Sequence, residues 1–141
     1  MHRDPSQTSY YVGDDFYQSL VDSYSNWQTD ESEVTDPELR NIFGMLLEKE
    51  ARLLDQNCLS DWLTLYVPEC IYWVPATPHG GDPRTEIAVC FDDRRRIEDR
   101  IYRLQNEFAW AQQPVSRTSR IISNISAFRT GETDTVMLRS T

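Results

Sequence analysis

The order of helical and extended patterns along the 141 residues predicts an α+β fold, with a curved antiparallel sheet packed on helices. Helical patterns come first, two short β-rich runs follow, and a further helix precedes two extended segments. A hydrophobic content of 39% and an aromatic content of 11% indicate a packed core. We therefore expect one α+β domain over residues 35–141, preceded by an N-terminal arm and acidic linker over residues 1–34.

The arm carries several aromatic residues among Ser, Gln and Asp. Phe16, Leu20 and Tyr24 recur at i, i+4 and i+8, which favours a short helix from Asp14 to Tyr24. Residues 29–36 are acidic and polar and indicate a linker. So many aromatic residues favour docking of the arm, either on its own domain or on a partner, and the sequence leaves both open.

The domain begins with a helix that has a clear start signal. Asp36 is a suitable N-cap, and Pro37 suits the first helical position. The apolar residues that follow keep helical spacing to about Gln56: Leu39, Ile42, Phe43, Leu46, Leu47, Leu53 and Leu54. A second, short helix is expected over residues 60–66, with Ser60 as its cap.

Two strands and a third helix are expected next. Residues 70–74 are rich in aromatic and β-branched types and end at Pro75, which predicts a strand, and a Gly- and Pro-rich loop follows over residues 77–84. Residues 86–91 predict a second strand that is apolar on both faces and covered on both sides. Asp92 or Asp93 is expected to cap the next helix.

That helix has the most regular amphipathic pattern in the chain. Its apolar residues fall at i, i+4, i+7 and i+11: Ile97, Ile101, Leu104 and Phe108. After Pro114, residues 117–128 predict a long strand and residues 129–133 a hairpin turn. A last strand is expected from Thr135 onward.

Composition excludes several classes of protein. A net charge of -9 has the wrong sign for a nucleic-acid binder. No apolar stretch approaches the roughly 18 residues that a membrane span requires, and the polar N-terminus does not resemble a signal peptide. Three cysteines (Cys58, Cys70 and Cys90) are odd in number and widely spaced, which favours free thiols in a cytoplasmic protein.

Residues for metal or nucleotide chemistry are scarce. The two histidines, His2 and His79, lie too far apart in the sequence to form a 2-His-1-carboxylate iron site within this chain. The cysteine spacings do not match paired zinc or iron–sulfur ligands, and no Gly-rich phosphate loop is present. We therefore assign no catalytic, cofactor-binding or metal-ligating residue to this chain.

Charged residues are concentrated near the third helix. In residues 92–103, five arginines face four carboxylates, and helical spacing pairs Asp92 with Arg96 and Arg94 with Glu98. One interpretation is a salt-bridged face exposed to solvent, and the other is a surface that binds a partner. Asp61, Asp92 and Asp93 are interpreted as helix caps or near-cap charges rather than catalytic acids.

Five segments, taken in order, resemble the small (beta) subunit of Rieske-type aromatic-ring-hydroxylating dioxygenases. They are EARLLD at residues 50–55, WLTLY at 62–66, YWVPA at 72–76, DDRRRIEDR at 92–100 and SRTSRIISN at 116–124. The resemblance implies a cone of the nuclear-transport-factor-2-like (cystatin-like) type and a non-catalytic role in assembling the oxygenase. It also implies a large (alpha) subunit that carries the Rieske 2Fe-2S cluster, the mononuclear iron and the substrate site.

The implied complex contains three large and three small subunits and takes electrons from NADH through a separate reductase. Its reaction would convert an aromatic ring to a cis-dihydrodiol during aromatic catabolism. Our interface candidates are Arg94, Arg95, Arg96, Arg117, Arg120 and Trp73. Members of this family continue with further strands, so either the sequence is truncated at its C-terminus, which we expect, or a partner fills the missing strand positions. The sequence names no substrate.

Two other functions are compatible with the same fold. The first is a stand-alone isomerase or dehydratase that uses the cone interior as an acid–base pocket, with Asp61, Tyr66 and Tyr72 as its candidate residues. The second is a structural interaction module without an oxygenase partner.

Overall fold

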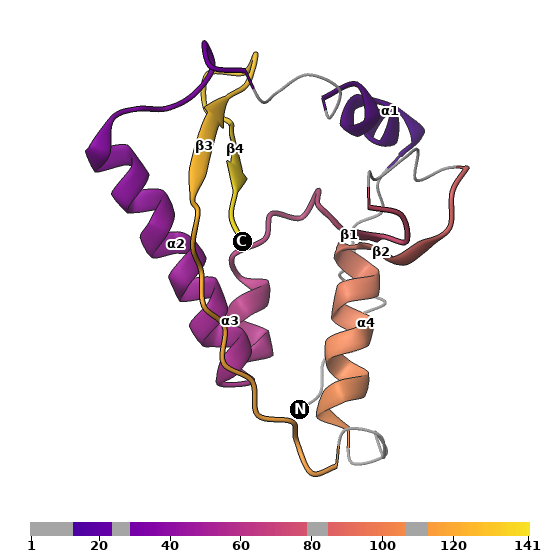
Figure 1. The fold of residues 1–141 in the computed structure, drawn as a ribbon. Helices are drawn as coiled ribbons and strands as arrows, with labels where there is room; N and C mark the ends of the chain where they lie inside the picture. Colours follow the sequence, from indigo (N-terminus) through magenta and orange to yellow (C-terminus); the bar gives the residue numbers. More distant parts are fainter. Residues whose placement is uncertain (1–12, 24–28, 79–84, 107–112) are drawn as a thin grey trace. The chain divides into compact units, whose positions relative to one another are not determined.

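The computed structural model describes residues 13–23, 29–78, 85–106 and 113–141 (Figure 1). The chain divides into two compact units, Met1–Gln18 with Leu59–Ser116 and Ser19–Cys58 with Arg117–Thr141. The helices are α1 (Asp14–Ser23), α2 (Pro37–Asp55), α3 (Leu59–Leu63) and α4 (Arg94–Gln105). The strands are β1 (Ile71–Pro75), β2 (Ala88–Asp93), β3 (Ser126–Arg129) and β4 (Val136–Arg139). They form two antiparallel two-stranded sheets, β1–β2 and β3–β4.

Helix α2 starts and ends as its sequence predicts. The side chain of Asp36 accepts the N–H of Glu38 at 2.9 Å, and Pro37 is the first helical residue. At the other end Asn57 adopts a left-handed conformation with φ 57°. The N–H of Cys58 reaches the carbonyl of Leu53 at 2.8 Å and that of Asn57 reaches Leu54, which forms a Schellman motif. Local backbone chemistry therefore sets both ends of the helix.

Helix α3 differs from its prediction at both ends. It begins at Leu59, so Ser60 lies within the helix and the prediction of a Ser60 cap is wrong. The reason is that the Schellman motif of α2 leads directly into the first turn of α3. The helix ends at Leu63, and the next three residues continue with tighter i→i−3 hydrogen bonds of the 3₁₀ type. Trp62, the fourth of its five residues, is buried.

Strands β1 and β2 form a ribbon with aromatic contacts on each face. Tyr72 of β1 meets the ring of Trp62 edge to face at 5.9 Å between centroids. On the other face, Phe91 of β2 stacks on Tyr17 of α1 at 5.4 Å, so the described part of the N-terminal arm docks on its own chain. The expectation that residues 86–91 are covered on both sides is wrong, because Ile87 is 86% exposed and Val89 is 75% exposed.

Helix α4 follows β2 without a loop. Asp93 is its N-cap and accepts the N–H of Arg96 at 3.0 Å, as predicted. Ile97 and Ile101 are buried, whereas Leu104 is exposed, so the predicted apolar stripe is only partly buried. Phe108, like the loop residues 79–84, lies outside the described residues.

Strand β3 is the central extended segment of the second unit. It pairs with β4 on one side, from Ser126 opposite Arg139 to Arg129 opposite Val136. On its other side lies the segment that the sequence indicated as a linker. There the N–H of Val34 binds the carbonyl of Ala127 at 2.8 Å, and the N–H of Arg129 binds the carbonyl of Ser32. The core of this unit includes Val34, Ala127 and Phe128.

The predicted long strand over residues 117–128 is wrong, because only Ser126–Arg129 forms a regular strand. Ser123 exchanges two hydrogen bonds with Thr141, both at 2.8 Å, while Ser126 lies opposite Arg139. Ser126 lies three residues after Ser123, whereas Arg139 lies only two residues before Thr141. The segment before β3 therefore carries one extra residue, which defines a β-bulge. Asn124, with φ 52°, occupies the bulge and interrupts the ladder. Arg40 of α2 donates to the carbonyl of Ile125 at 2.9 Å and holds the bulge against the helix.

Across the residues that the structure describes, no helix is both long and apolar enough to cross a lipid bilayer.

Candidate functional site

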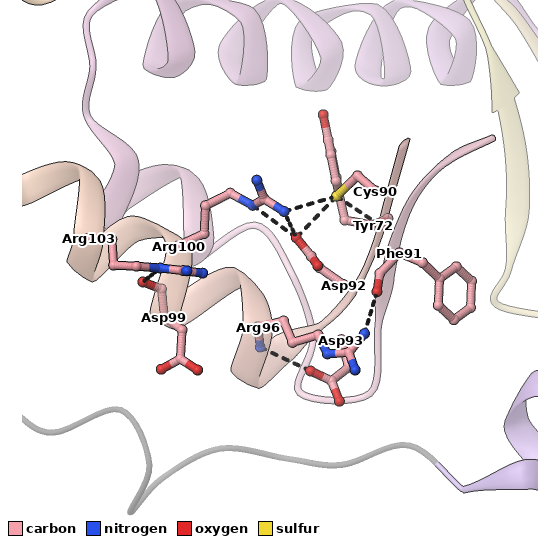
Figure 2. A network of polar contacts seen from close by, with 9 residues as sticks. All are labelled: Tyr72, Cys90, Phe91, Asp92, Asp93, Arg96, Asp99, Arg100 and Arg103. Carbon is pink, nitrogen blue, oxygen red and sulfur yellow. Dashed lines mark hydrogen bonds and ion pairs between the residues drawn. The ribbon is translucent and has the colours of Figure 1, made fainter. Parts of the chain in front are cut away.

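A polar network of described residues lies where β2 runs into α4 (Figure 2). Two adjacent aspartates at this junction, Asp92 and Asp93, are 7% and 8% exposed. A buried carboxylate is costly unless it is paired and hydrogen-bonded. Each of the two therefore has a dedicated set of donors.

Asp92 binds a guanidinium and a thiol through one oxygen. Its Oδ2 accepts Nε of Arg100 at 2.9 Å, a second nitrogen of the same guanidinium, and Sγ of Cys90 at 3.0 Å. Figure 2 shows both donors converging on this carboxylate. The hydrogen bond to Asp92 raises the pKa of Arg100, and burial followed by the Asp92 hydrogen bond raises the pKa of the Cys90 thiol. Both effects favour the protonated thiol, which donates to Asp92.

Asp93 fixes the turn between β2 and α4. It caps the helix through the N–H of Arg96, whose guanidinium also donates to the carbonyl of Phe91 at 3.1 Å. Burial and then the charge of Asp93 raise the pKa of Tyr17, which stacks on Phe91. Asp93 and Arg96 therefore hold the entry to α4, next to the strand residue on which Tyr17 stacks.

Arg94 joins α4 to the end of α3. Its Nε binds Glu98 at 2.9 Å, and its Nη1 binds the carbonyls of Leu63 and Tyr66 at 2.9 and 2.8 Å. Leu63 is the last residue of α3 and Tyr66 ends the 3₁₀ turn after it, so one guanidinium donates to a carbonyl at each of these two ends. The side chain of Arg94 is only 20% exposed and that of Glu98 only 16%. Arg94 therefore has an internal structural role.

A second cluster joins the end of α2 to the extended segment before β3. Asp55 accepts the Thr118 hydroxyl at 2.8 Å, the backbone N–H of Arg120 at 2.8 Å, and the Arg120 guanidinium. The Arg120 N–H contributes most, and the Thr118 hydroxyl next, to lowering the pKa of Asp55. We call this cluster the Asp55 clamp.

The structure separates the predicted interface residues into two groups. Arg94, Arg95 and Arg96 share the first turn of α4, and Trp73 lies half-buried with its ring 6.3 Å from Phe91. Arg95 is half-buried and Arg96 is exposed. Arg117 and Arg120 belong to the other compact unit, where Arg117 is exposed and Arg120 is part of the Asp55 clamp.

One predicted ion pair is confirmed and another is wrong. Arg94 and Glu98 pair across one helical turn, as their spacing predicts. Asp92 pairs with Arg100 rather than with Arg96, because Asp92 belongs to strand β2 and does not follow helical spacing. Sequence reasoning also missed the clamp, since no local signal connects Asp55 with residues more than sixty positions away.

The residues proposed for an acid–base pocket do not form one. Asp61 is exposed on α3, while the rings of Tyr66 and Tyr72 pack against Trp62 at 4.8 and 5.9 Å. Within the described ranges, no group of three or more His, Cys, Asp or Glu side chains is placed to hold a metal ion.

Known proteins resemble this chain from about residue 49 onward. The family model described as the ring hydroxylating beta subunit matches residues 49–141. The chain is 39% identical over 87 residues to the benzoate 1,2-dioxygenase subunit beta of Acinetobacter baylyi, covering 58% of this chain and 52% of that protein. It is 37% identical over 82 residues to the 2-halobenzoate 1,2-dioxygenase small subunit of Burkholderia cepacia, covering 55% of this chain and 50% of that protein.

A third relative is the small oxygenase component of the p-cumate 2,3-dioxygenase system of Pseudomonas putida, with 40% identity over 82 residues, 57% of this chain and 46% of that protein. The chain thus spans about half the length of the curated relatives it matches.

Structural similarity agrees with the sequence. A chain in the solved structure of naphthalene 1,2-dioxygenase with indole bound in the active site matches with a TM-score of 0.61 and 18% identity, covering 99% of this chain and 72% of that one. This similarity confirms the predicted α+β fold class, with antiparallel sheets and helices consistent with the nuclear-transport-factor-2-like type. Because the family model matches well over half of the sequence, the chain belongs to the ring-hydroxylating beta subunit family.

Proposed function

We propose that this chain acts as the small subunit of a multicomponent aromatic-ring-hydroxylating dioxygenase, where it supports assembly of the oxygenase. The match of the family model over residues 49–141 carries this proposal. The relatives cited above are themselves named as a beta subunit, a small subunit and a small oxygenase component. The buried polar groups of the chain fit a supporting role, because Asp92 and Arg94 are fully engaged in fixing one element to another.

The proposal includes a large (alpha) subunit as the main partner. That subunit would carry the Rieske 2Fe-2S cluster, the mononuclear iron and the substrate pocket, and would receive electrons from NADH through a separate reductase. Three large and three small subunits would form the complex, and the ring would be converted to a cis-dihydrodiol. The names of the relatives support a larger partner, since a beta or small subunit is one part of an assembly. We place the complex in the cytoplasm, where the three free cysteines would stay reduced.

The relatives also support a substrate class. They are named for benzoate, 2-halobenzoate, p-cumate and toluate, which are all aromatic rings that carry a carboxylate. We therefore propose an aromatic carboxylate as the substrate of the complex. The similarity to naphthalene 1,2-dioxygenase is a similarity of fold and does not argue for an uncharged substrate.

Contacts within the chain guide our choice among the proposed interface residues. The guanidinium groups of Arg94 and Arg120 both bind groups of this chain, so we propose that Arg94 acts mainly in stability, whereas Arg120, whose side chain is 41% exposed, remains an interface candidate of second rank. Arg96 and Arg117 keep exposed side chains and remain our first candidates for contacts with carboxylates of a partner. Arg95 and Trp73 stay candidates of second rank because both are half-buried.

The test is to isolate the tagged chain gently from cells that express it naturally and to record the visible spectrum of the purified material. We expect a red-brown complex with Rieske-type absorption bands and a second, larger polypeptide. Oxygen uptake should then be faster with benzoate than with naphthalene. A colourless single polypeptide would contradict the proposed function, and oxygen uptake with naphthalene alone would contradict the substrate class.

A further inference from the structure

One face of α4 carries three arginines, Arg96, Arg100 and Arg103, which we call the α4 arginine row. Residues at i, i+4 and i+7 of a helix lie on the same side, and Figure 2 shows the three side chains along α4. The guanidinium of Arg100 is paired with Asp92. Arg96 and Arg103 are exposed and make no ion pair with a described residue, and each guanidinium donates to one backbone carbonyl. A guanidinium has five N–H donors, so both can also bind a carboxylate from outside the chain.

Carboxylates reduce the net charge of this row. Asp99 lies within it, and the buried Asp92 and Asp93 lie at its start, so residues 92–103 carry five arginines and four carboxylates. A region with so small a net charge attracts a partner only weakly over long distances. The row therefore suits a partner that brings carboxylates into direct contact with the exposed guanidinium groups, because such charge-assisted hydrogen bonds are short and specific in geometry.

A β-turn in the other compact unit offers such carboxylates. It covers residues 29–32, and we call it the acidic turn. The N–H and the hydroxyl of Ser32 both bind the carbonyl of Thr29, at 3.0 and 2.9 Å, which closes the turn. Asp30 and Glu31 occupy its two central positions, and both are exposed and make no ion pair with a described residue.

The backbone that carries the acidic turn is held in place. The carbonyl of Ser32 accepts the N–H of Arg129 in β3 at 2.7 Å, and the N–H of Val34 binds the carbonyl of Ala127 at 2.8 Å. The turn is thus attached to a paired segment, so ordering it on binding costs little conformational entropy.

A second copy of this chain is the partner that these two surfaces favour. They match in kind and in number, since the row offers two guanidiniums without an ion pair and the turn offers two such carboxylates. Copies that each carry a net charge of -9 repel one another, so they associate only where local groups of opposite charge meet. The row and the turn are different surfaces, and contacts between different surfaces of identical subunits form closed rings when the rotation permits. Three small subunits in one complex require a contact of this kind if they form a ring.

We propose that the α4 arginine row of one small subunit binds the acidic turn of a neighbouring small subunit. The number of small subunits rests on the proposed function, whereas the pairing itself concerns this chain alone.

Cross-linking without a spacer tests this contact. Lys49 is the only lysine of the sequence, so Arg103→Lys adds one side-chain amine and keeps the charge of the row. The complex is assembled from equal amounts of isotopically light and heavy Arg103→Lys chain and treated with a carbodiimide, which joins an amine directly to a carboxylate. We expect links from position 103 to Asp30 or Glu31 that join a light peptide to a heavy one. The exposed Lys49 reports the background reaction, and the chain without the substitution should give no link at position 103.

Each other result overturns the proposed pairing. Links found only between peptides of the same label show a contact within one chain. A link from position 103 to the large subunit identifies that subunit as the partner of the row, and the absence of any link at position 103 shows that no carboxylate contacts it. A chain that never associates with a large subunit refutes the proposed function, but the same cross-linking of the isolated chain still tests the pairing between copies.

Charge reversal gives an independent readout. Arg96→Glu in the Arg103→Lys chain should lower the yield of links between light and heavy peptides about fivefold or more, because like charges then meet. Reversing the carboxylate that position 103 does not link, by Asp30→Arg or Glu31→Arg, should restore the yield. Arg52→Glu is the matched control, since it makes an equal change of charge at an exposed position of α2 and should have no effect. Thermal unfolding of each variant checks that folding is retained. A yield that Arg96→Glu leaves unchanged, or that the second reversal does not restore, overturns the proposal.

Discussion

Replacing Arg94 with methionine should destabilise the chain far more than the same replacement at Arg96, only two positions away. Arg94 makes three hydrogen bonds, to Glu98 and to the carbonyls of Leu63 and Tyr66, from a side chain that is 20% exposed. A hydrogen bond to a charged group contributes about 1.5–3 kcal/mol. The three share one guanidinium, and the two carbonyls regain some contact with water after its removal. We therefore expect a loss of about 3 kcal/mol in the free energy of unfolding.

Arg96 is exposed, and its guanidinium makes one hydrogen bond to a carbonyl, so Arg96→Met should cost less than about 1 kcal/mol. Arg94→Lys keeps the charge but not the planar fork, so it should recover only part of the loss. Urea unfolding followed by tryptophan fluorescence measures all three variants, since Trp62 and Trp73 lie in the same compact unit. A loss of 3 kcal/mol corresponds to a fall of about 9 °C in Tm for a chain of this size.

A difference of less than about 0.5 kcal/mol between Arg94→Met and Arg96→Met would refute the reasoning, since it would mean that the contacts of Arg94 contribute little. The comparison also distinguishes stability from assembly. If Arg96 contacts a partner, its replacement should weaken the complex while the isolated chain keeps its stability.

Three further predictions concern the second unit. Hydrogen bonds lower the pKa of Asp55 in the folded chain below its value in the unfolded chain. The Asp55 carboxylate therefore stabilises the fold fully at pH values above the unfolded pKa, and this stabilisation is lost as the pH falls through the folded pKa. Asp55→Asn should therefore lower the Tm at neutral pH, and the Tm of the variant should fall less than that of the parent chain as the pH drops below about 4. The same dependence of Tm on pH in both proteins would contradict this. Asn57 has a left-handed backbone with φ 57°, which glycine adopts easily and alanine does not. Asn57→Ala should therefore lower the free energy of unfolding in urea by about 1 kcal/mol, whereas Asn57→Gly should leave it unchanged. Equal free energies of unfolding for the two variants would contradict this. Gly44→Ala should raise the free energy of unfolding by about 1 kcal/mol, because alanine favours the helix more than glycine does. The added methyl would lie 3.6 Å from Ile125, which is an ordinary contact distance. A lower Tm would show that α2 packs too tightly at this position.

Several features could be predicted from sequence because short stretches of chain determine them. The caps at Asp36 and Asp93 depend on a carboxylate beside the first free N–H groups of a helix. The pair of Arg94 with Glu98 depends on helical spacing alone. The element order and the family resemblance likewise depend on residues read in sequence; the structure confirms the order of the elements, and the family model confirms the resemblance.

Other features depend on which distant segments meet. From sequence, Asp92 is interpreted as a cap or near-cap charge and Arg100 as one charge of a salt-bridged face. Only the junction of β2 with α4 places the two side chains in an ion pair. The predicted long strand is interrupted at Asn124, where a bulge carbonyl is held by Arg40 from α2. The segment indicated as a linker is instead hydrogen-bonded to β3.

The sequence by itself therefore determined the starts of α2 and α4, the α+β class and the family. The tertiary structure alone decided which arginines are internal, and it placed Asp55 beside residues 118–120. The physical reason is the range of the interactions. Propensity and capping act within a few residues, whereas the partner of a buried charge is whichever group the packing of separate elements brings within hydrogen-bond distance.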